Sequence, residues 1–368
     1  MSAAIHAITM PKWGLSMKEG RLNGWLVEEG ASVEPGSELA DIESDKIAGT
    51  LEATVAGPLR RRVAREDEVL PVGALLGVVA DSEVADAEID AVVADFSERF
   101  VPEEAEDEAE AGPQSVEVDG CRIGYVVRGE GGEPLVLVHG FGGDKNNWLF
   151  NHEPLAASRA VYALDLPGHG ESEKRLAGDN GPEGLSRTLL GFMDAVGIER
   201  AHLAGHSLGG AVAILAAASA PERVLSLALV ASAGLGPEID AEYLRSFAQT
   251  NSRNQLKKLA QRLFADESLV TRSLVEDLLK YKRMDGVTQV LTAIADSVLE
   301  GSAQRAYLAE TAAGLGLPVR VVWGAEDRII PASHARALDR KADIHVVPGA
   351  GHMVMMEAPK DVNRVLAG

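Results

Sequence analysis

The stretch Gly205-His206-Ser207-Leu208-Gly209-Gly210 decides the fold of the larger part of this chain. It follows the apolar run 201–204 and precedes the alanine-rich run 211–218, an order that predicts a buried strand, a sharp turn and a helix. The small residues around Ser207 permit a strained turn that pushes the serine oxygen into a pocket. The helix behind it offers backbone N–H groups where negative charge develops. The stretch therefore predicts a nucleophilic serine.

The composition limits the classes of partner and cofactor. The chain has 368 residues, enough for two or more domains, and 46% of them are apolar, which suffices for packed cores. Its 35 basic and 56 acidic residues give a net charge of −21, which argues against nucleic acid or an anionic membrane as the main partner. The single cysteine, Cys121, excludes an internal disulfide and a cysteine-based metal site, and we expect no metal. No signal-like start or membrane-length apolar run is present, so we expect a soluble, cytoplasmic protein.

Two further residues complete a candidate catalytic set. A serine hydroxyl needs a histidine to take its proton and a carboxylate to orient that histidine. Asp327 follows the predicted strand 318–323, and His352 follows the predicted strand 344–347. Both residues therefore reach the edge of the sheet where Ser207 projects, in the chain order serine, acid, histidine. Together the three residues predict a Ser-His-Asp triad.

The remainder of the C-terminal part alternates predicted strands and helices. Asp119-Gly120 is a strong signal for a two-residue hairpin turn. The predicted strands are 115–118, 121–127, 135–138, 160–164, 201–204, 224–230, 318–323 and 344–347. Helical stretches between most of them predict a mostly parallel sheet. The segment 236–313 has no strand pattern, so we expect it to form helices inserted as a cap over the carboxyl edge of the sheet.

These motifs resemble those of the α/β-hydrolase family across 114–368. The matching pieces are the serine turn, the loops of Asp327 and His352, and the stretches 139–143 and 165–170. By this resemblance, the backbone N–H groups of Phe141 and Leu208 form the oxyanion hole.

Four other residues near these motifs compete for catalytic roles. His139, His169 and His206 are interpreted as structural histidines rather than as the base. Glu326 is the rival for the acid, but the spacing Gly324-x-x-Asp327-x-x-x-Pro331 favours Asp327.

The segment 1–80 contains an internal repeat with a period of 37 residues. The shift pairs Gly20 with Gly57, Leu22 with Leu59, Leu26 with Val63, Val33 with Leu70, Gly36 with Gly73, Leu39 with Leu76, and Ile42 with Val79. Two such halves predict a small β domain of two sheets that close their apolar faces on each other. The segment 42–50 must turn back between them. This places Lys46 at an exposed hairpin tip, as a plain surface lysine or a site of modification.

Residues 5–80 resemble a lipoyl domain, an all-β flattened sandwich. The Asp-Lys tip of that family is here Asp45-Lys46, and its opening is Met10-Pro11-Lys12-Trp13-Gly14. The related biotin-carrying domains place methionine on both sides of the lysine, whereas Asp45 and Ile47 flank it here. The resemblance therefore implies lipoate bound covalently to Lys46, on an arm that makes transfer of a carried acyl group effectively intramolecular.

An acidic segment separates the two parts. Residues 81–112 hold thirteen acidic residues against Arg99 alone, which gives this segment −12 of the total charge of −21. The run 103–110 predicts an extended, self-repelling chain. Apolar residues near helical spacing in 84–100 predict a short amphipathic helix, which docks on a partner, docks on its own chain or is loosely held. The predicted organisation is a lipoyl domain 1–80, a linker 81–113 and a hydrolase domain 114–368 with its cap at 236–313.

The combination of the two domains resembles the acyltransferase (E2) subunits of acetoin dehydrogenase complexes. The usual 2-oxoacid dehydrogenase subunits end in a different catalytic domain with the signature His-x-x-x-Asp-Gly. That signature is absent, because Ser115 and Tyr281 stand four residues before the two Asp-Gly pairs of the sequence, at 119 and 285. The resemblance implies a thiamine-diphosphate E1, a flavin E3 (dihydrolipoyl dehydrogenase) and a lipoylating enzyme as partners. No small basic subunit-binding domain is visible, so the docking of E1 and E3 stays open, as does a homo-oligomer.

The predicted activity is transfer of an acetyl group from the arm on Lys46, through Ser207, to coenzyme A. The cap segment 241–285 carries nine basic and six acidic residues. The basic cluster of Arg253, Lys257, Lys258 and Arg262 either holds the phosphates of coenzyme A or forms an exposed helix face. Two alternatives remain, an α/β-fold esterase or thioesterase with an attached lipoyl domain, and a lipoyl carrier with a vestigial triad. The sequence does not indicate the preferred acyl chain.

Overall fold

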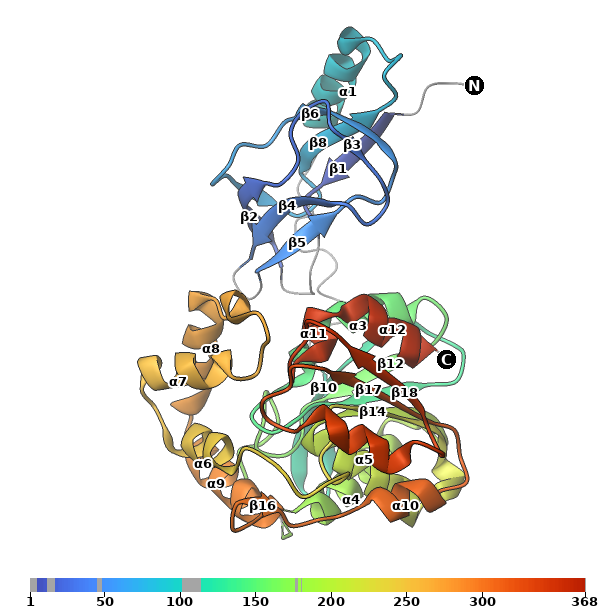
Figure 1. The fold of residues 1–368 in the computed structure, drawn as a ribbon, viewed down its shortest axis with the longest axis vertical. Coiled ribbons are helices and arrows are strands. Elements are labelled where there is room, and N and C mark those ends of the chain that lie inside the picture. The colour runs from blue at the N-terminus through green and yellow to red at the C-terminus, as the bar shows by residue number, and fades with distance from the viewer. Residues whose placement is uncertain are drawn as a thin grey trace. The chain divides into compact units, whose positions relative to one another are not determined.

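The computed structural model describes residues 5–11, 17–44, 48–100, 114–175, 178–179 and 181–367. The chain forms two compact units, Met1–Glu110 and Ala111–Gly368, and each has its own fold (Figure 1). Across the described ranges, every helix is too short or too polar to span a lipid bilayer.

The N-terminal unit contains two four-stranded sheets, with the strand orders β1-β8-β6-β3 and β5-β4-β2-β7. All pairings within them are antiparallel. The strands are β1 (Ile5–Thr9), β2 (Glu19–Trp25), β3 (Ser32–Val33), β4 (Glu38–Glu43), β5 (Ala48–Glu52), β6 (Gly57–Arg62), β7 (Val69–Pro71) and β8 (Leu75–Ala80). The predicted two-sheet β domain is thereby confirmed.

The two halves of the sequence repeat interlock. β3 of the first half pairs with β6 of the second, and β7 of the second half pairs with β2 of the first. Equivalent positions of the two halves supply the core: Leu22 and Leu59 are fully buried, as are Leu39 and Leu76. Removal of these side chains from water is the main favourable contribution to folding of so small a unit. Because each half completes the sheet of the other, the repeat folds as one unit.

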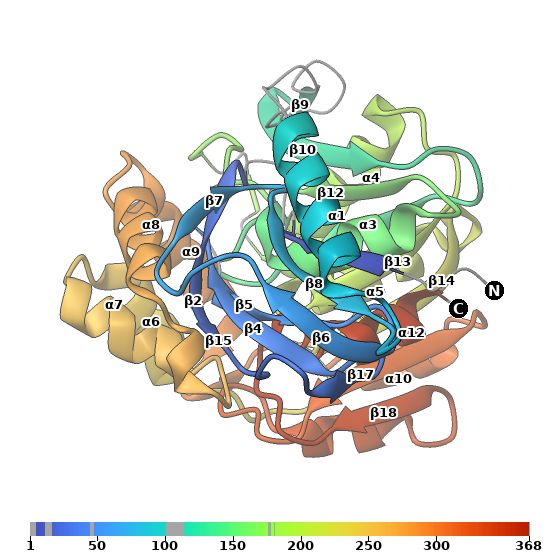
Figure 2. The same cartoon turned by 90° about the horizontal axis from the view of Figure 1, so that it is seen from above.

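The helix predicted in the acidic segment is α1 (Asp86–Arg99), and it packs on its own unit. Ile89 is fully buried in one apolar cluster with Val78 of β8, and α1 lies beside β8 in Figures 1 and 2. Arg60 and Arg61 form ion pairs with two acidic residues of the helix at 2.9 and 2.6 Å. Exposed ion pairs contribute little to stability, whereas burial of one isoleucine contributes about 1.5–3 kcal/mol. Apolar contacts therefore hold α1 in place.

The C-terminal unit is built on one eight-stranded sheet with the order β18-β17-β14-β13-β11-β12-β10-β9. The strands from β18 to β12 in this order run parallel, and β10 and β9 are added antiparallel at one edge. The bounds are β9 (Gln114–Val118), β10 (Cys121–Arg128), β11 (Leu135–Val138), β12 (Val161–Leu164), β13 (Ala201–His206), β14 (Val224–Val230), β17 (Val319–Gly324) and β18 (Asp343–Val347). Asp119 and Gly120 form the β9–β10 turn with φ of 50° and 72°. The predicted mostly parallel sheet is confirmed.

Helices cover both faces of this sheet (Figure 1). α4 (Pro182–Ala195), α5 (Leu208–Ser219) and α10 (Ala309–Gly314) pack together in one layer, and α3 (Leu149–Ala156), α11 (Val354–Glu357) and α12 (Pro359–Ala367) pack together in another. Four 3-10 helices, η1 (Lys145–Trp148), η2 (Pro221–Arg223), η3 (Glu267–Leu269) and η4 (Ala332–Leu338), complete the connections. The loops after β13, β17 and β18 share the carboxyl edge of the sheet, because these strands are parallel.

Four helices between β14 and β17 form the expected cap: α6 (Ala241–Gln249), α7 (Arg253–Gln261), α8 (Arg272–Lys282) and α9 (Val287–Val298). The expectation that 236–313 contains no strand was wrong. Two-residue strands, β15 (Leu299–Glu300) and β16 (Ala303–Gln304), form a hairpin whose turn includes Gly301 at φ 63°. Strands this short carry no recognisable alternation of apolar and polar residues. The end of the segment, α10, packs on α5.

Candidate active site

Ser207 lies on the turn between β13 and α5, with φ of 51° and ψ of −117°. A non-glycine residue in such a conformation costs about 1–3 kcal/mol, which the surrounding structure must offset. A Cβ atom on Gly205 would lie 2.2 Å from the Gly209 oxygen, and one on Gly209 would lie 2.3 Å from the Val138 oxygen. No side chain fits at either position. Both glycines are therefore needed to present Ser207 at the start of α5.

Asp327 and His352 meet on the loops that follow β17 and β18. Nδ1 of His352 lies 2.8 Å from Oδ2 of Asp327. The same oxygen accepts a hydrogen bond from Nε1 of Trp323 at 3.0 Å. Oδ1 accepts from the backbone N–H groups of Ile329 and Ile330 at 2.8 and 3.0 Å. These contacts fix the carboxylate, so it can orient the imidazole and stabilise its charged form.

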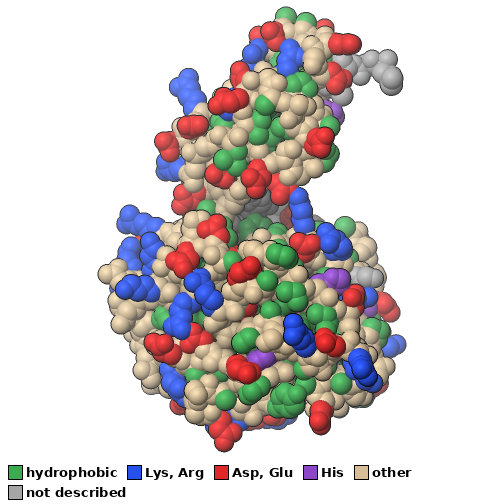
Figure 3. All heavy atoms as spheres, viewed as in Figure 1, with side chains coloured by type: hydrophobic (Ala, Val, Ile, Leu, Met, Phe, Trp, Pro, Cys, Tyr) green, Lys and Arg blue, Asp and Glu red, His purple; other side chains and the backbone are tan. Residues whose placement is uncertain are grey.

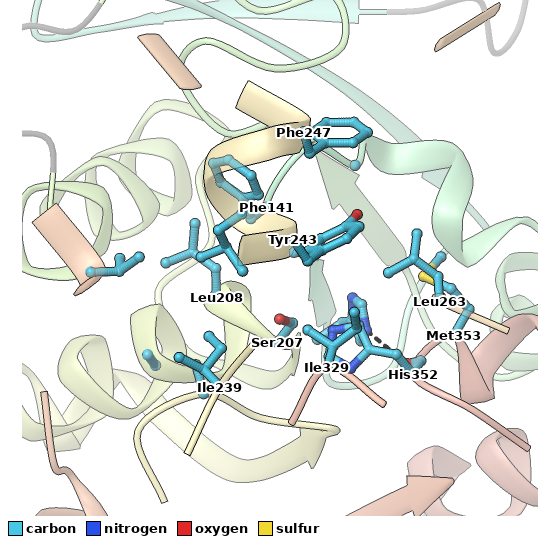
Figure 4. A pocket seen from close by; sticks show the side chains of 18 of the residues that line it. Phe141, Ser207, Leu208, Ile239, Tyr243, Phe247, Leu263, Ile329, His352 and Met353 are labelled. Atoms are coloured by element: carbon cyan, nitrogen blue, oxygen red, sulfur yellow. Dashed lines mark hydrogen bonds between the residues drawn. The ribbon is translucent and has the colours of Figure 1, made fainter. Parts of the chain in front are cut away.

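Ser207 and His352 line one cavity of about 240 Å³. Figure 4 shows the Ser207 side chain in this cavity, with His352 beside it. Within the part of the chain that the structure describes, Oγ of Ser207 makes no hydrogen bond. Catalytic hydrogen bonds are often long without substrate and tighten when it binds. The structure thus brings Ser207, Asp327 and His352 to one edge of the sheet and leaves the serine hydroxyl unpaired.

Phe141 and Leu208 present backbone N–H groups at the same cavity. Phe141 lies in the loop after β11, and Leu208 is the first residue of α5. Neither N–H donates to another group in the described ranges. For Leu208 the reason is its position, because the first four N–H groups of a helix have no partner inside it. The two groups suit an oxyanion hole, and the helix N-terminus adds positive potential there.

A buried ion pair anchors the loop that carries Phe141. Nζ of Lys145 donates to Oδ2 of Asp165 at 2.9 Å, and the Lys145 backbone N–H donates to Oδ1 at 2.7 Å. Burial by itself raises the pKa of Asp165, but the Lys145 ammonium and the backbone donors lower the pKa overall. Sequence reasoning missed this pair, because 20 residues separate the partners and no spacing pattern connects them.

The remaining competitors have structural contacts. Nε2 of His139 accepts from a backbone N–H of the loop after β12 at 2.9 Å. Nε2 of His206 lies 3.0 Å from the carbonyl oxygen of His352 and so supports the loop of that residue. Burial lowers the pKa of His206 well below 6.5 and that of His169 to about 3. Both rings are therefore neutral. Glu326 is exposed, which leaves Asp327 as the carboxylate in contact with His352.

Apolar side chains form most of the cavity wall (Figure 4). α6 contributes Tyr243 and Phe247, and Leu263, Ile329 and Met353 add to the wall. Burial raises the pKa of Tyr243, so its hydroxyl stays protonated. Sequence reasoning predicted the cap but not these residues. The signal that could identify them is the helical spacing of apolar residues within α6.

The basic cluster considered for phosphate recognition lies outside the cavity. Arg253 and Arg262 form ion pairs with acidic residues of the same region. Lys257 and Lys258 are exposed on α7, and Figure 3 shows basic side chains gathered on this part of the surface. None of the four lines the cavity. The exposed helix face is therefore the interpretation that the structure favours.

Lys46 and its neighbours Asp45 and Ile47 lie outside the described residues. β4 and β5 pair antiparallel as far as Glu43 and Ala48, so the chain between these two residues joins adjacent strands. The attachment of lipoate to Lys46 is carried forward as a proposal.

Comparison with known proteins matches each of the two units to a known family. A family model described as alpha/beta hydrolase fold matches residues 133–359, and one described as biotin-requiring enzyme matches residues 6–79. The dihydrolipoyllysine-residue acetyltransferase component of the acetoin cleaving system of Pseudomonas putida is 53% identical over 363 residues, covering 98% of this chain and 97% of that protein. The component of the same name from Cupriavidus necator is 48% identical over 366 residues, covering 100% of this chain and 97% of that protein.

Solved structures share the fold. The meta-cleavage product hydrolase CumD of Pseudomonas fluorescens IP01 is 26% identical with a TM-score of 0.64, covering 70% of this chain and 97% of that chain. The hydrolase family model spans more than half of the present chain, and the relative from P. putida spans nearly all of it. This chain therefore belongs to the α/β-hydrolase fold family through its C-terminal unit and, over its full length, to the dihydrolipoyllysine-residue acetyltransferases of acetoin cleaving systems.

Proposed function

We propose that this enzyme transfers an acetyl group from a lipoyl arm on Lys46 to coenzyme A through an ester on Ser207. The observation that carries the proposal is the hydrogen bond between His352 and Asp327 at a cavity that Ser207 and His352 both line. Nucleophilic catalysis by serine requires a base and an orienting acid in this relation. A biotin/lipoyl-type unit in the same chain gives the serine a thioester donor.

Acylation uses groups that lie at the cavity. Ser207 Oγ attacks the carbonyl carbon of the acetyl thioester while Nε2 of His352 takes the hydroxyl proton. The backbone N–H groups of Phe141 and Leu208 stabilise the oxyanion, and the loss of one such donor typically lowers the rate by about 10²–10³-fold. When the carbon–sulfur bond breaks, His352 returns the proton to the leaving sulfur. Asp327 stabilises the imidazolium throughout.

Deacylation reverses these roles. His352 takes the proton from the thiol of coenzyme A, whose sulfur attacks the carbonyl carbon of the ester on Ser207. The carbon–oxygen bond breaks, and His352 returns the proton to Oγ. Water competes with the thiol for this ester. The apolar wall formed by Tyr243, Phe247 and Met353 supports exclusion of water from the bond.

The N-terminal unit suits lipoate as its prosthetic group. Its strands β4 and β5 form an antiparallel hairpin in one sheet of a two-sheet β unit, and they pair up to Glu43 and Ala48, the described residues next to the segment that contains Lys46. Bound to Lys46, lipoate would supply a dithiol that carries acyl groups on a long arm. The proposed domain organisation is the lipoyl domain 1–80, the connecting segment 81–113 and the hydrolase domain 114–368.

The proposed partners follow from the same reaction. We infer a thiamine-diphosphate E1 that loads the arm, a flavin E3 that reoxidises it and an enzyme that attaches lipoate. The names of the curated relatives describe them as components of a larger system, which supports assembly with other subunits. A cytoplasmic location suits an enzyme that draws on coenzyme A.

A thioesterase or esterase is the second candidate. The three catalytic groups suit hydrolysis as well as transfer, and the fold is shared with a meta-cleavage product hydrolase at 26% identity. The two candidates differ only in whether a thiol or water takes the acetyl group from Ser207.

One assay separates these functions. Lipoylated wild type and Ser207→Ala are given an acetyl-loaded arm and coenzyme A, and acetyl-CoA and free acetate are measured. Serine-dependent acetyl-CoA supports transfer, and serine-dependent acetate supports hydrolysis. Product formation that does not depend on Ser207 would indicate a lipoyl carrier with a vestigial triad. A Lys46→Arg variant that still accepts lipoate would overturn the assignment of the arm.

A further inference from the structure

One basic side chain lines the catalytic cavity. Among the described residues, Arg305 is the single lysine or arginine in the cavity wall, and Glu183 is the single acid. Arg305 directly follows β16 and lies outside the basic cluster on α7. The acetyl-transfer steps at Ser207 make no use of it. A cation at the wall of a mostly apolar cavity, in a chain of net charge −21, therefore needs an explanation.

The backbone holds the Arg305 guanidinium in a fixed orientation. Nε donates to the Ser297 carbonyl at 2.9 Å, and Nη2 donates to the carbonyls of Leu299 at 2.9 Å and Asp296 at 3.3 Å. These carbonyls lie at the C-terminal end of α9, so the contacts cap that helix. Capping leaves one nitrogen unused: in the described part of the chain, Nη1 has no acceptor and no carboxylate pairs with Arg305. The guanidinium is thus positioned to bind an anion through Nη1.

The end of the cavity near Arg305 is its polar end. The polar side chains Glu183, Ser297 and Gln304 also line the cavity there. Gln304 precedes Arg305 in the chain, Ser297 accepts from it, and Glu183 and Ser297 both lie beside Gly181. Glu183 is an exposed carboxylate, so an anion must bind nearer to Arg305 than to Glu183.

The opposite end of the cavity is mostly apolar, although Asn147 of η1, a 3-10 helix that packs against α11, also lines the cavity. Leu263, Phe264, Met353 and Met356 line it, and the Met353 N–H donates to the Leu263 carbonyl. In Figure 4, Ser207 lies between Ile239 on one side and Leu263 and Met353 on the other. Ile239 marks the polar end, because the adjacent Glu238 carbonyl accepts from the Gln304 side chain at 3.0 Å. The reacting serine therefore lies between an apolar end and a polar end.

We propose that the polar end is the coenzyme A site, with Arg305 binding a phosphate of that acceptor, and that the apolar end holds the hydrocarbon of the acyl donor. The assignment rests on the proposed acetyl transfer. Guanidinium groups bind phosphate through directed, charge-assisted hydrogen bonds. A phosphorylated thiol that enters from Arg305 reaches Ser207 from the side opposite to the donor. The two substrates then use different parts of one cavity.

The test compares acceptors that differ in phosphate. Lipoylated full-length protein is assayed for acetyl transfer to coenzyme A, to dephospho-coenzyme A and to pantetheine, which carries no phosphate. In Arg305→Gln we expect the KM for coenzyme A to rise about tenfold or more, since hydrogen bonds to charged groups are worth a factor of that order. The KM for pantetheine and the acylation of Ser207 by p-nitrophenyl acetate should stay unchanged. Dephospho-coenzyme A shows whether the 3′-phosphate or the pyrophosphate is bound.

Two further variants keep the test decisive. Arg245→Gln removes the same charge from α6, where Arg245 donates to the Gly301 carbonyl and does not line the cavity, so it should behave as wild type. Arg305→Lys keeps the charge and should retain part of the affinity if Arg305→Gln folds poorly. Equal rises in KM for coenzyme A and pantetheine, or no rise for either, would show that Arg305 only caps α9.

Equilibrium binding separates this proposal from the proposed function. Calorimetry of coenzyme A with wild type and Arg305→Gln needs no turnover. Binding that depends on Arg305 in a protein that forms only acetate would uphold the site and overturn the transfer function. Transfer that proceeds with binding independent of Arg305 would uphold the function and overturn the site.

Discussion

Two buried carboxylates, on the loops that follow β17 and β12 of the same sheet, have different partners. Asp327 accepts hydrogen bonds from an indole, two backbone N–H groups and the His352 imidazole, whereas Asp165 pairs with the Lys145 ammonium. Neither carboxylate side chain is exposed. A partner that is always charged neutralises Asp165 and makes it an anchor. Asp327 instead faces an imidazole, the group proposed to transfer protons in catalysis. The identity of the partner, and not burial, distinguishes the carboxylate proposed for catalysis from the structural one.

The largest predicted effect is the loss of acylation rate in Asp327→Asn. Loss of the carboxylate charge should slow acylation of Ser207 by p-nitrophenyl acetate by about 10³–10⁴-fold, as expected for an orienting acid in a triad. Initial rates measure the effect, and circular dichroism checks the fold. Glu326→Gln is the matched control, because Glu326 is adjacent and exposed. A loss of less than tenfold in Asp327→Asn would remove this residue from the catalytic set.

Asp165→Asn should lower the stability of the folded protein more than its acylation rate. It leaves the buried Lys145 ammonium with Glu171, 3.1 Å away, as its remaining carboxylate partner, so the loss should be smaller than the about 3–5 kcal/mol that a buried charge without any partner costs. Denaturant unfolding measures the loss, and acylation by the folded fraction should fall less than in Asp327→Asn. The double variant Lys145→Met, Asp165→Asn also removes the buried ammonium that has lost one of its carboxylate partners, and it should recover part of the stability. A double variant less stable than the sum of the single losses would contradict the anchoring role.

The stability difference between wild type and Asp165→Asn should depend on pH. The folded pKa of Asp165 lies below its ordinary value of 3.8, so its contribution is present above that value and is lost as the pH falls through the folded pKa. The two unfolding free energies should therefore converge in acid and differ most near neutral pH. Urea titrations from pH 7 down to about pH 2 measure this, because the contribution begins to fall only below 3.8. A constant difference over that range would be incompatible with the ion pair.

Asp144 gives the smallest expected effect. Its pKa is raised to about 6, first by burial and then by the nearby Asp165. The folded state thus holds this proton more tightly than the unfolded state, and wild-type stability should fall as the pH rises through about 6. Asp144 is the N-cap of η1, where its side chain accepts from the Asn146 backbone N–H. Asp144→Asn should remove the decline in stability and be slightly more stable than wild type at pH 8, because asparagine is also a good N-cap. A variant that is less stable at pH 8 would refute this reading.

The sequence predicted what local patterns encode. Eight short apolar runs, each bounded by turn residues, became the eight strands of the large sheet, and the 37-residue period became two interlocked sheets. The order of Ser207, Asp327 and His352 predicted three residues that the structure brings together. The Lys145–Asp165 pair could not be predicted, because it depends on how two loops approach in space. Arg305 could not be identified from the sequence, because it lies outside any cluster of basic residues.

The helix α1 shows the same limit. Its amphipathic pattern indicates that one face is covered, but not by what. In the structure, Ile89 of α1 packs against residues of β8 in its own unit.

In the proposed mechanism, Ser207 carries the acetyl group between two thiols. Full-length lipoylated protein is incubated with an acetyl donor without coenzyme A, quenched in acid, digested and examined by mass spectrometry. The proposed mechanism predicts an acetyl group on the peptide that contains Ser207, lost rapidly on addition of coenzyme A as acetyl-CoA forms. Absence of acetyl-Ser207, or its loss to acetate at the same rate with and without coenzyme A, would contradict the claim.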